Sequence, residues 1–172
     1  PTAAGRAEAL LVTAWRSGIT DPQELANFMG QMQHESQHFT RLEENLNYSG
    51  DRLYAVFPNR NGLTRERALA IAGMANPTIQ LTGRRNYQAY GDALGLDLVN
   101  HPDLASQPDH AARIAVHYWK DLTLRDPQAR TDVARAGAHI NSGRPDGEVK
   151  GLAERQDGAA RWLLALQDPD YL

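Results

Sequence analysis

The strongest constraint on the fold is an apolar stripe at helical spacing that leads to a carboxylate. A helix can begin at Thr20-Asp21-Pro22, which supplies a capping side chain and a proline for the first turn. The stripe follows at positions i, i+3, i+4 and i+7, as Leu25, Phe28, Met29 and Met32. Glu35 comes next on this face, where partial loss of water favours the protonated carboxyl group. The Met and Gln side chains of this helix are interpreted as core and surface, respectively.

Similar spacing elsewhere predicts a mainly α fold. Further helices are expected over residues 6–16, 50–57, 64–71 and 86–94, from 108 and 126 onward, and over 148–167. The first carries an apolar stripe at Ala7, Leu10, Leu11, Ala14 and Trp15. The last is expected to bury Leu152, Ala159, Trp162, Leu163 and Leu166. Ile79-Gln80-Leu81-Thr82 alternates apolar and polar residues, which indicates a short extended segment in a chain with little or no other β-strand.

Length and composition exclude several classes of protein. The 172 residues correspond to one domain, residues 1–172, with one main core. The net charge of −3 and the pI of about 6.1 argue against a nucleic-acid partner. No run approaches the roughly 20 apolar residues of a membrane span. The sequence has no cysteine, which excludes thiolate chemistry and fits a chain that folds in a reducing cytosol.

Residues 34–38 also match the short zinc-protease signature, since they read His34-Glu35-Ser36-Gln37-His38. The two histidines would bind zinc, and Glu35 would activate a metal-bound water. A third ligand is not evident, because no other histidine stands at a spacing known for a zinc protease, whether His101, His110, His117 or His139. Phe39-Thr40-Arg41 does not continue the metzincin pattern. A zinc metallohydrolase therefore remains an alternative.

A pair of carboxylates offers a different chemistry. Glu44 follows Glu35 after nine positions, in a polar segment rich in turn formers. Glycoside hydrolysis needs one protonated carboxyl group as acid and one ionised group as base or nucleophile. Glu35 suits the acid, Glu44 in a solvated loop suits the base, and the Thr82 hydroxyl could hold an attacking water. Two neighbouring glutamates are more often a solvated face, so their spacing alone leaves both interpretations open.

Three blocks of sequence, in this order along the chain, carry a further signal. The first contains His34-Glu35-Ser36 and Glu44-Asn45-Leu46-Asn47-Tyr48-Ser49, with Phe39 and Leu42 between them. The second is Ile79-Gln80-Leu81-Thr82-Gly83-Arg84-x-Asn86-Tyr87. The third is Ile140-Asn141-Ser142-Gly143 followed by Gly151-Leu152-x-x-Arg155. Together they resemble glycoside hydrolase family 19, a chitinase-like family, and within it the bacteriophage endolysin branch.

The resemblance implies a lysozyme-like helical domain with a substrate cleft and no cofactor. It also implies an inverting enzyme that cleaves β-1,4 bonds between N-acetylated amino sugars. Glu35 matches the family's general acid, Glu44 its general base and Thr82 the hydroxyl that positions the water. Matches to polar groups that line the sugar-binding cleft are found at His34, Gln80, Asn86 and Asn141. Arg155 matches a buried arginine near the acid, and His38 is interpreted as an exposed residue at the helix end.

Some of these positions have simpler interpretations. Asn86 could cap its helix, and Asn141 could terminate one. The family usually carries a segment rich in Gly, Arg and aromatic residues before the second block, and here Met74-Ala75-Asn76-Pro77-Thr78 stands in its place. This departure affects the sugar contacts expected on that side of the cleft rather than the two carboxylates.

The substrate is expected to be the glycan of bacterial peptidoglycan. Secreted plant relatives carry disulfides and a signal peptide, and this sequence shows neither. We expect a monomer that is made in the bacterial cytoplasm and acts on the cell wall in the periplasm after release, without a membrane partner. A toxin delivered into neighbouring bacteria is also compatible. The alternatives are a chitinase acting on chitin oligomers, and an inactive sugar-binding protein or phage structural component that would not need both glutamates.

Overall fold

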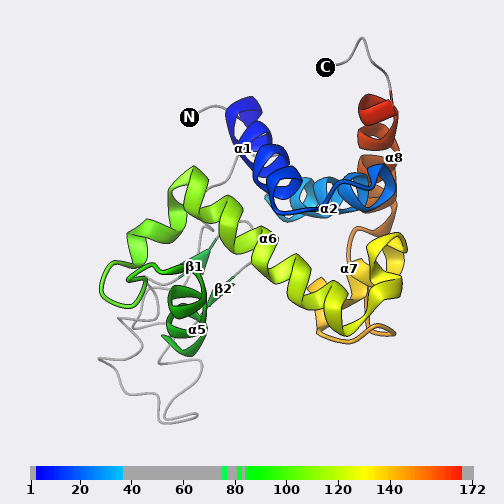
Figure 1. Cartoon of the computed structure of the whole chain (residues 1–172). Coiled ribbons are helices and arrows are strands. Elements are labelled where there is room, and N and C mark those ends of the chain that lie inside the picture. The colour runs from blue at the N-terminus through cyan, green and yellow to red at the C-terminus, as the bar shows by residue number, and fades with distance from the viewer. Residues whose placement is uncertain (1–2, 37–74, 77–80, 83, 168–172) are drawn as a thin grey trace.

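The computed structural model describes residues 3–36, 75–76, 81–82 and 84–167, and these residues are mainly helical (Figure 1). The predicted fold class is therefore confirmed. The helices expected over residues 50–57 and 64–71 lie outside the described residues. None of the helices in the described part of the chain has the length and apolarity needed to cross a membrane.

Helices α1 (Ala3–Arg16) and α2 (Pro22–Glu35) form where the sequence predicts them. Asp21 caps α2, because its carboxylate accepts a hydrogen bond of 3.0 Å from the backbone N–H of Glu24. The expected stripe of α2 is buried throughout, as Leu25, Phe28, Met29 and Met32. The expectation for Trp15 is wrong, since this side chain is 57% exposed. Leu10 and Ala14 carry the packing of α1 instead, and Trp15 lies about 100° further round the helix.

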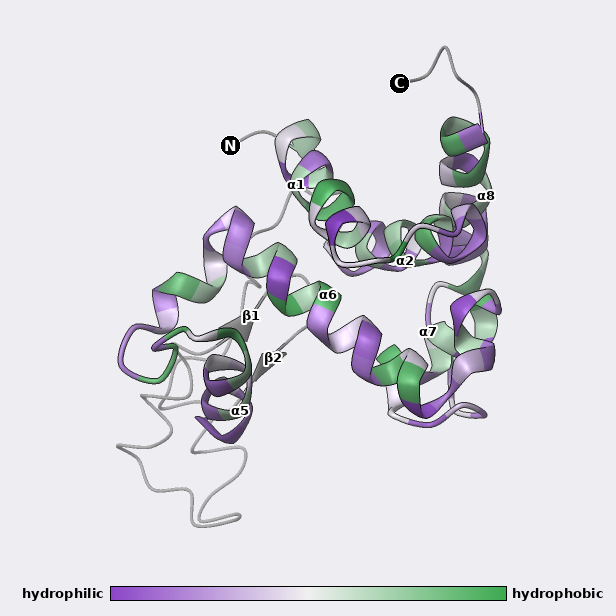
Figure 2. Ribbon diagram, in the orientation of Figure 1, coloured by the Kyte–Doolittle hydropathy of each residue, from purple (hydrophilic) through white to green (hydrophobic). Residues whose placement is uncertain are grey.

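Helix α6 (Pro108–Arg125) supplies much of the core that covers α1 and α2. Figure 2 shows apolar and polar residues alternating along α6, as an amphipathic helix requires. Its expected inward residues are all buried, namely Ala112, Ala115, Val116 and Trp119. The Trp119 ring meets Phe28 of α2 edge-on at 5.6 Å between centroids, and its indole N–H donates to Glu24.

A smaller apolar cluster forms around helix α5 (Arg84–Leu94). It consists of Tyr87, Leu98, Ala105 and Ile114, and Ile114 belongs to α6. The 3-10 helix η2 (Pro102–Ser106), which the sequence analysis did not predict, provides Ala105. Strands β1 (Ala75–Asn76) and β2 (Leu81–Thr82) pair antiparallel, with Ala75 opposite Thr82. The extended segment predicted over residues 79–82 is confirmed for Leu81 and Thr82, and residues 79 and 80 lie outside the described residues.

Two predicted helix starts are wrong. The helix expected from Asp126 is divided into a 3-10 helix, η3 (Pro127–Arg130), and α7 (Val133–Ser142). The reason is a second capping residue, because the Asp132 carboxylate accepts from the backbone N–H of Arg135. The last helix begins at residue 152 rather than 148, as α8 (Leu152–Gln167). Gly151 has a φ of 70°, which is a left-handed conformation. A right-handed helix that began at residue 148 could not run through this glycine. Of the residues expected to be buried on α8 only Ala159 is, and the rest are partly exposed.

Helices α2 and α8 form the most extensive helix pair among the described residues, and Figure 1 shows them crossing. Glycines permit this close contact. A Cβ atom at Gly30 would lie 2.6 Å from the backbone nitrogen of Ala159. At Gly158, which faces Gly30, the nearest atom to such a Cβ would be 3.3 Å away. The two backbones are therefore closer at Gly30 than any side chain there would allow.

The crossing predicts unequal effects of the same substitution in the two helices. Alanine favours a helix over glycine by about 1 kcal/mol at either position. We expect Gly30→Ala to lower the free energy of unfolding by about 1–3 kcal/mol, because α8 must move away. Gly158→Ala should change it by less than about 1 kcal/mol in either direction, because the nearest atom there is 3.3 Å away and has to shift by only a few tenths of an ångström. Urea denaturation of both variants measures this difference, and equal stabilities would contradict the close approach.

Asp126 joins the end of α6 to α7 electrostatically. Its carboxylate, 12% exposed, accepts hydrogen bonds from the Arg135 guanidinium and from His139 Nε2 at 2.7 Å. These two hydrogen bonds hold the pKa of Asp126 below its ordinary value of 3.8. In the folded state the charged form is therefore the stabilised one.

The sign of this shift predicts a pH dependence. A lowered folded pKa contributes stability that is fully present above pH 3.8 and is lost as the pH falls through the folded value. Wild type should thus exceed Asp126→Asn in thermal stability at pH 7, and the difference should shrink as the pH falls below 3.8. Asp121→Asn, which alters an exposed pair with Arg125 on the same helix, is the control. A gap for Asp126→Asn that stays constant down to low pH would contradict the pairing.

Candidate active site

Glu35 ends α2 and lies at the contact with α8. Its side chain is 11% exposed, and its Oε1 accepts a hydrogen bond of 2.6 Å from Nη2 of Arg155. Arg155 itself is only 1% exposed. The C-terminal end of α2 is closed by Ser36, whose hydroxyl donates to the Met32 carbonyl at 2.7 Å. The predicted acid and the predicted buried arginine are therefore direct partners in a nearly water-free contact.

Two forces act on the Glu35 charge in opposite directions. Burial disfavours the carboxylate, and a guanidinium at hydrogen-bond distance stabilises it. A buried carboxylate without a partner would be strongly destabilising, so Arg155 makes it possible to place this group away from bulk water. Because the contact is charge-assisted, it also restricts the orientation of the Glu35 carboxyl group.

A chain of buried amides continues from Arg155 into the core. Nη1 of Arg155 donates to Oε1 of Gln31 at 2.8 Å, one helical turn before Glu35. The Gln31 amide nitrogen donates to Oδ1 of Asn27 at 2.9 Å and to the Val133 carbonyl at 3.0 Å. Gln31 and Asn27 are at most 1% exposed. The expectation that the glutamines of this helix lie on its surface is therefore wrong for Gln31, which α8 and α7 cover.

The burial of Gln31 and Asn27 was not predicted, although the sequence carries a signal for it. Asn27, Gln31 and Glu35 recur every four residues, which places them along one side of α2. Polar side chains that recur at this spacing next to an apolar stripe are candidates for a buried hydrogen-bonded row. Only the burial by α7 and α8 distinguishes this row from a solvated helix face.

His34 is held at the same end of the helix pair. Its Nδ1 lies 2.9 Å from a carboxylate oxygen of Glu154 on α8. The ring packs so closely on Gly151 that a Cβ there would overlap it. Gly151 and Glu154, at the start of α8, therefore set the orientation of the His34 ring, and the role of His34 in lining a sugar-binding cleft stays a prediction.

Asn141 and Asn86, the predicted sugar contacts, are distributed over different elements. Asn141 lies near the end of α7, and its amide nitrogen donates to the Glu148 carbonyl at 2.9 Å. It therefore also closes the loop between α7 and α8. Asn86 is exposed in the first turn of α5, and Thr82 is the last residue of β2. Glu44 and Gln80 lie outside the described residues, so the distance between the two glutamates stays a prediction, as do all these roles.

Tyr118 of α6, which no sequence motif singles out, interacts electrostatically with Glu35. Burial raises the pKa of Tyr118 to about 12. The charges of Arg125, Glu35, Asp121 and Arg155 act on it as well, which places this phenol within electrostatic reach of the acid and its arginine. Tyr90 of α5 interacts with Tyr118 in the same way. No motif in the sequence points to these tyrosines, because their proximity arises from helices distant in the chain.

The metal-binding alternative finds limited support in the described residues. There, no three side chains of His, Asp or Glu are grouped closely enough to hold a metal ion. His34 directs Nδ1 at Glu154, and His38, the other proposed ligand, lies outside the described residues. The zinc interpretation consequently still rests on the five-residue match alone.

Comparison with known proteins supports the family assignment. The sequence model of the family described as chitinase class I matches residues 3–139. A glycosyl hydrolase family 19 domain-containing protein of Haemophilus influenzae is 30% identical over 166 residues, which cover 81% of this chain and 78% of that protein. The match distinguishes no branch of the family.

Plant proteins match shorter stretches. Chitinase 11 of Oryza sativa subsp. japonica is 40% identical over 74 residues, or 42% of this chain and 29% of that protein. The acidic 27 kDa endochitinase of Solanum lycopersicum is 35% identical over 101 residues, or 56% of this chain and 36% of that protein. The chain thus spans about a third of the length of these plant relatives. The family model and the Haemophilus relative both extend over most of the chain, which therefore belongs to glycoside hydrolase family 19, the class I chitinase family.

Proposed function

We propose that this protein is an inverting glycoside hydrolase that cleaves β-1,4 bonds between the N-acetylated amino sugars of bacterial peptidoglycan. In this proposal Glu35 is the general acid and Glu44 the general base. The observation that carries it is the placement of Glu35, 11% exposed and bonded to Arg155, at the end of α2. A general acid must be kept from bulk water yet remain able to reach a leaving oxygen, and a partly buried position at a helix end meets both needs.

The second carboxylate must differ in its environment from the first. Glu44 stands in a polar segment, where solvent keeps a carboxylate ionised and able to accept a proton from water. The Thr82 hydroxyl would orient that water, and Gln80, Asn86, Asn141 and His34 would bind the sugars. For inversion the two carboxyl groups should lie roughly 6.5–9.5 Å apart, since the attacking water must fit between them.

Peptidoglycan is preferred to chitin on the basis of the chain's composition. A chain without cysteine is suited to synthesis in a reducing cytoplasm, and a phage endolysin that reaches the periplasm after release fits this property. Delivery into neighbouring bacteria as an antibacterial toxin is compatible with the same chemistry. Chitin remains the second candidate, because several relatives bear the name chitinase. Mass spectrometry of digested peptidoglycan would identify the bond that is cut.

The first test concerns the acid. We expect wild type to hydrolyse purified peptidoglycan without added metal, and Glu35→Gln to lose at least roughly 100-fold in rate, because an amide cannot donate the required proton. The variant should keep its fold, since a glutamine oxygen can still accept from Arg155. Glu8→Gln, an exposed change on α1, is the control for loss of one carboxylate. Activity retained in Glu35→Gln would refute the assignment, and loss of wild-type activity in a chelator would favour zinc.

The second test concerns the base. Glu44→Gln should reduce the rate by roughly 100-fold or more, because the attacking water then has no proton acceptor. Adding azide as a small external nucleophile tests the geometry, because an anion that replaces the water on that face should restore turnover and give an inverted glycosyl azide. A product that keeps the original anomeric configuration would contradict inversion. A rate close to wild type in Glu44→Gln would remove Glu44 from the mechanism.

A further inference from the structure

We propose that Gln31 and Asn27 are positioning residues, which hold Arg155 and thereby the acid Glu35 in the orientation needed for proton donation. This inference rests on the proposed function of Glu35 and adds residues to its machinery. The side chain of Gln31 bonds Arg155 and Asn27, and the side chain of Asn27 bonds Gln31 and the carbonyls of Ala129 and Arg130, so both act on the Glu35 carboxylate through Arg155.

The direction of every hydrogen bond in this row is determined by backbone carbonyls. The Asn27 side chain directs one atom at the carbonyls of Ala129 and Arg130, at 2.9 and 3.0 Å. Both carbonyls can only accept, so this atom is the amide nitrogen, and the Asn27 oxygen must face Gln31. The Gln31 nitrogen then meets two acceptors, and its oxygen must face Arg155.

The hydrogen bonds of Asn27 therefore determine that Arg155 faces the oxygen of the Gln31 amide. Three of its donors have separate acceptors, since Nε donates to the Lys150 carbonyl at 2.9 Å, Nη1 to Gln31 and Nη2 to Glu35. If the Gln31 amide were reversed, its N–H₂ would oppose the guanidinium donors. Arg155 would then turn away from Glu35 or lose a bond, because a planar guanidinium moves as one unit.

Packing keeps the row from rearranging. The aliphatic part of the Arg155 side chain packs on Gly137 of α7, where a Cβ atom would lie 3.0 Å from Cδ of Arg155. Arg155, Gln31 and Asn27 are each at most 1% exposed, so water does not compete for their bonds. Such a row transmits orientation over two turns of α2, about 12 Å from Asn27 to Glu35.

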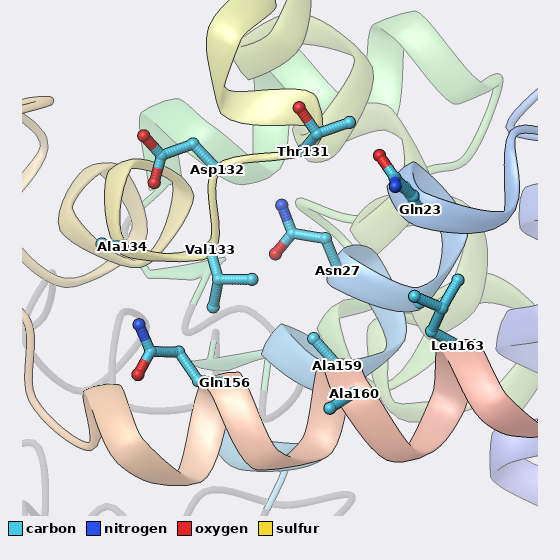
Figure 3. Close-up of a pocket in the computed structure, with 11 residues that line it drawn as sticks. Gln23, Asn27, Thr131, Asp132, Val133, Ala134, Gln156, Ala159, Ala160 and Leu163 are labelled. Carbon is cyan, nitrogen blue, oxygen red and sulfur yellow. The ribbon is translucent and has the colours of Figure 1, made fainter.

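At Asn27 the row borders a cavity of about 600 Å³ between α2, α8 and residues 131–134. Figure 3 shows the Asn27 side chain directed toward the segment from Thr131 to Val133, with Gln156 and Ala159 of α8 on the far side. Once Asn27 is truncated to alanine, water from this cavity can satisfy the carbonyls of Ala129 and Arg130, so Asn27→Ala is expected to fold. Because water can both donate and accept, it does not fix the direction of the Gln31 amide as Asn27 does.

The experiment compares Gln31→Met and Asn27→Ala with Gln33→Met, using purified peptidoglycan as the substrate. Gln33→Met is the matched control, since Gln33 also bonds α8, by accepting from the Trp162 indole at 2.9 Å, whereas Nε, Nη1 and Nη2 of Arg155 donate to Lys150, Gln31 and Glu35. We expect kcat to fall roughly 10- to 100-fold in Gln31→Met and Asn27→Ala, with KM changed less than about twofold. Gln33→Met should lose thermal stability and keep its kcat. A normal kcat in folded Gln31→Met or Asn27→Ala, or an equal loss in Gln33→Met, overturns the proposal.

A double-substitution cycle separates positioning from general loss of stability. Arg155→Lys keeps the charge but cannot bond Gln31 and Glu35 as a planar fork. Adding Gln31→Met to Arg155→Lys should lower kcat by less than about twofold further, because the residue through which Gln31 acts is already gone. Losses that multiply in the double variant overturn the proposal.

A readout independent of activity is the NMR signal of the Arg155 guanidinium. Its N–H groups should rotate and exchange slowly in wild type and Gln33→Met, and at least tenfold faster in Gln31→Met. Unchanged rates in Gln31→Met overturn the proposal by themselves. If Glu35→Gln is inactive but Gln31→Met has the kcat of wild type, only the positioning role is refuted. If Glu35→Gln is active, the proposed function is refuted, and the NMR result alone decides whether Gln31 holds Arg155.

Discussion

The rest of the site depends on the ion pair between Arg155 of α8 and Glu35 of α2. A guanidinium that is 1% exposed loses nearly all its water on folding, and the loss must be offset by acceptors placed at several of its donors. These acceptors come from three places, namely the Glu35 carboxylate, the Gln31 amide and the Lys150 carbonyl. The position of the acid is therefore coupled to the packing of α2 against α8, and a change in that packing is also a change in the site.

The close contact of the two helices makes this pair possible. Gly30 brings the α2 backbone so near to Ala159 that a single methyl group would separate the helices. At the other end, Gly151 leaves room for the His34 ring, which Glu154 holds from α8. The small residues at the crossing thus set the distance between α2 and α8. At the end of the crossing, the charged and polar residues make hydrogen bonds that this distance allows. Helix α6, through Trp119 and Phe28, supports α2 from the other side.

Much of the helical architecture was predictable because local signals agree with one another. α2 has a capping aspartate, a proline in its first turn and an apolar stripe, and each points to the same helix. The failures arose where a second local signal competed, as at Asp132, which starts a new helix inside a pattern that could be one helix. The predicted burial of Trp15 was wrong for a different reason, since an apolar residue at the edge of a stripe is buried only if another element covers it.

The sequence by itself determined the family, the order of its three blocks and the candidate acid, because these depend on residue types at short spacing. It did not distinguish Gln31, which is buried, from Gln23 or Gln33, which stand on the same helix with the same side chain. Only the tertiary structure decided this, since two of the partners of Gln31, Val133 and Arg155, are 102 and 124 residues away. The four-residue spacing of Asn27, Gln31 and Glu35 places them on one side of α2 but does not identify such distant partners, and the hydrogen bonds to these partners specify how Arg155, and with it Glu35, is oriented.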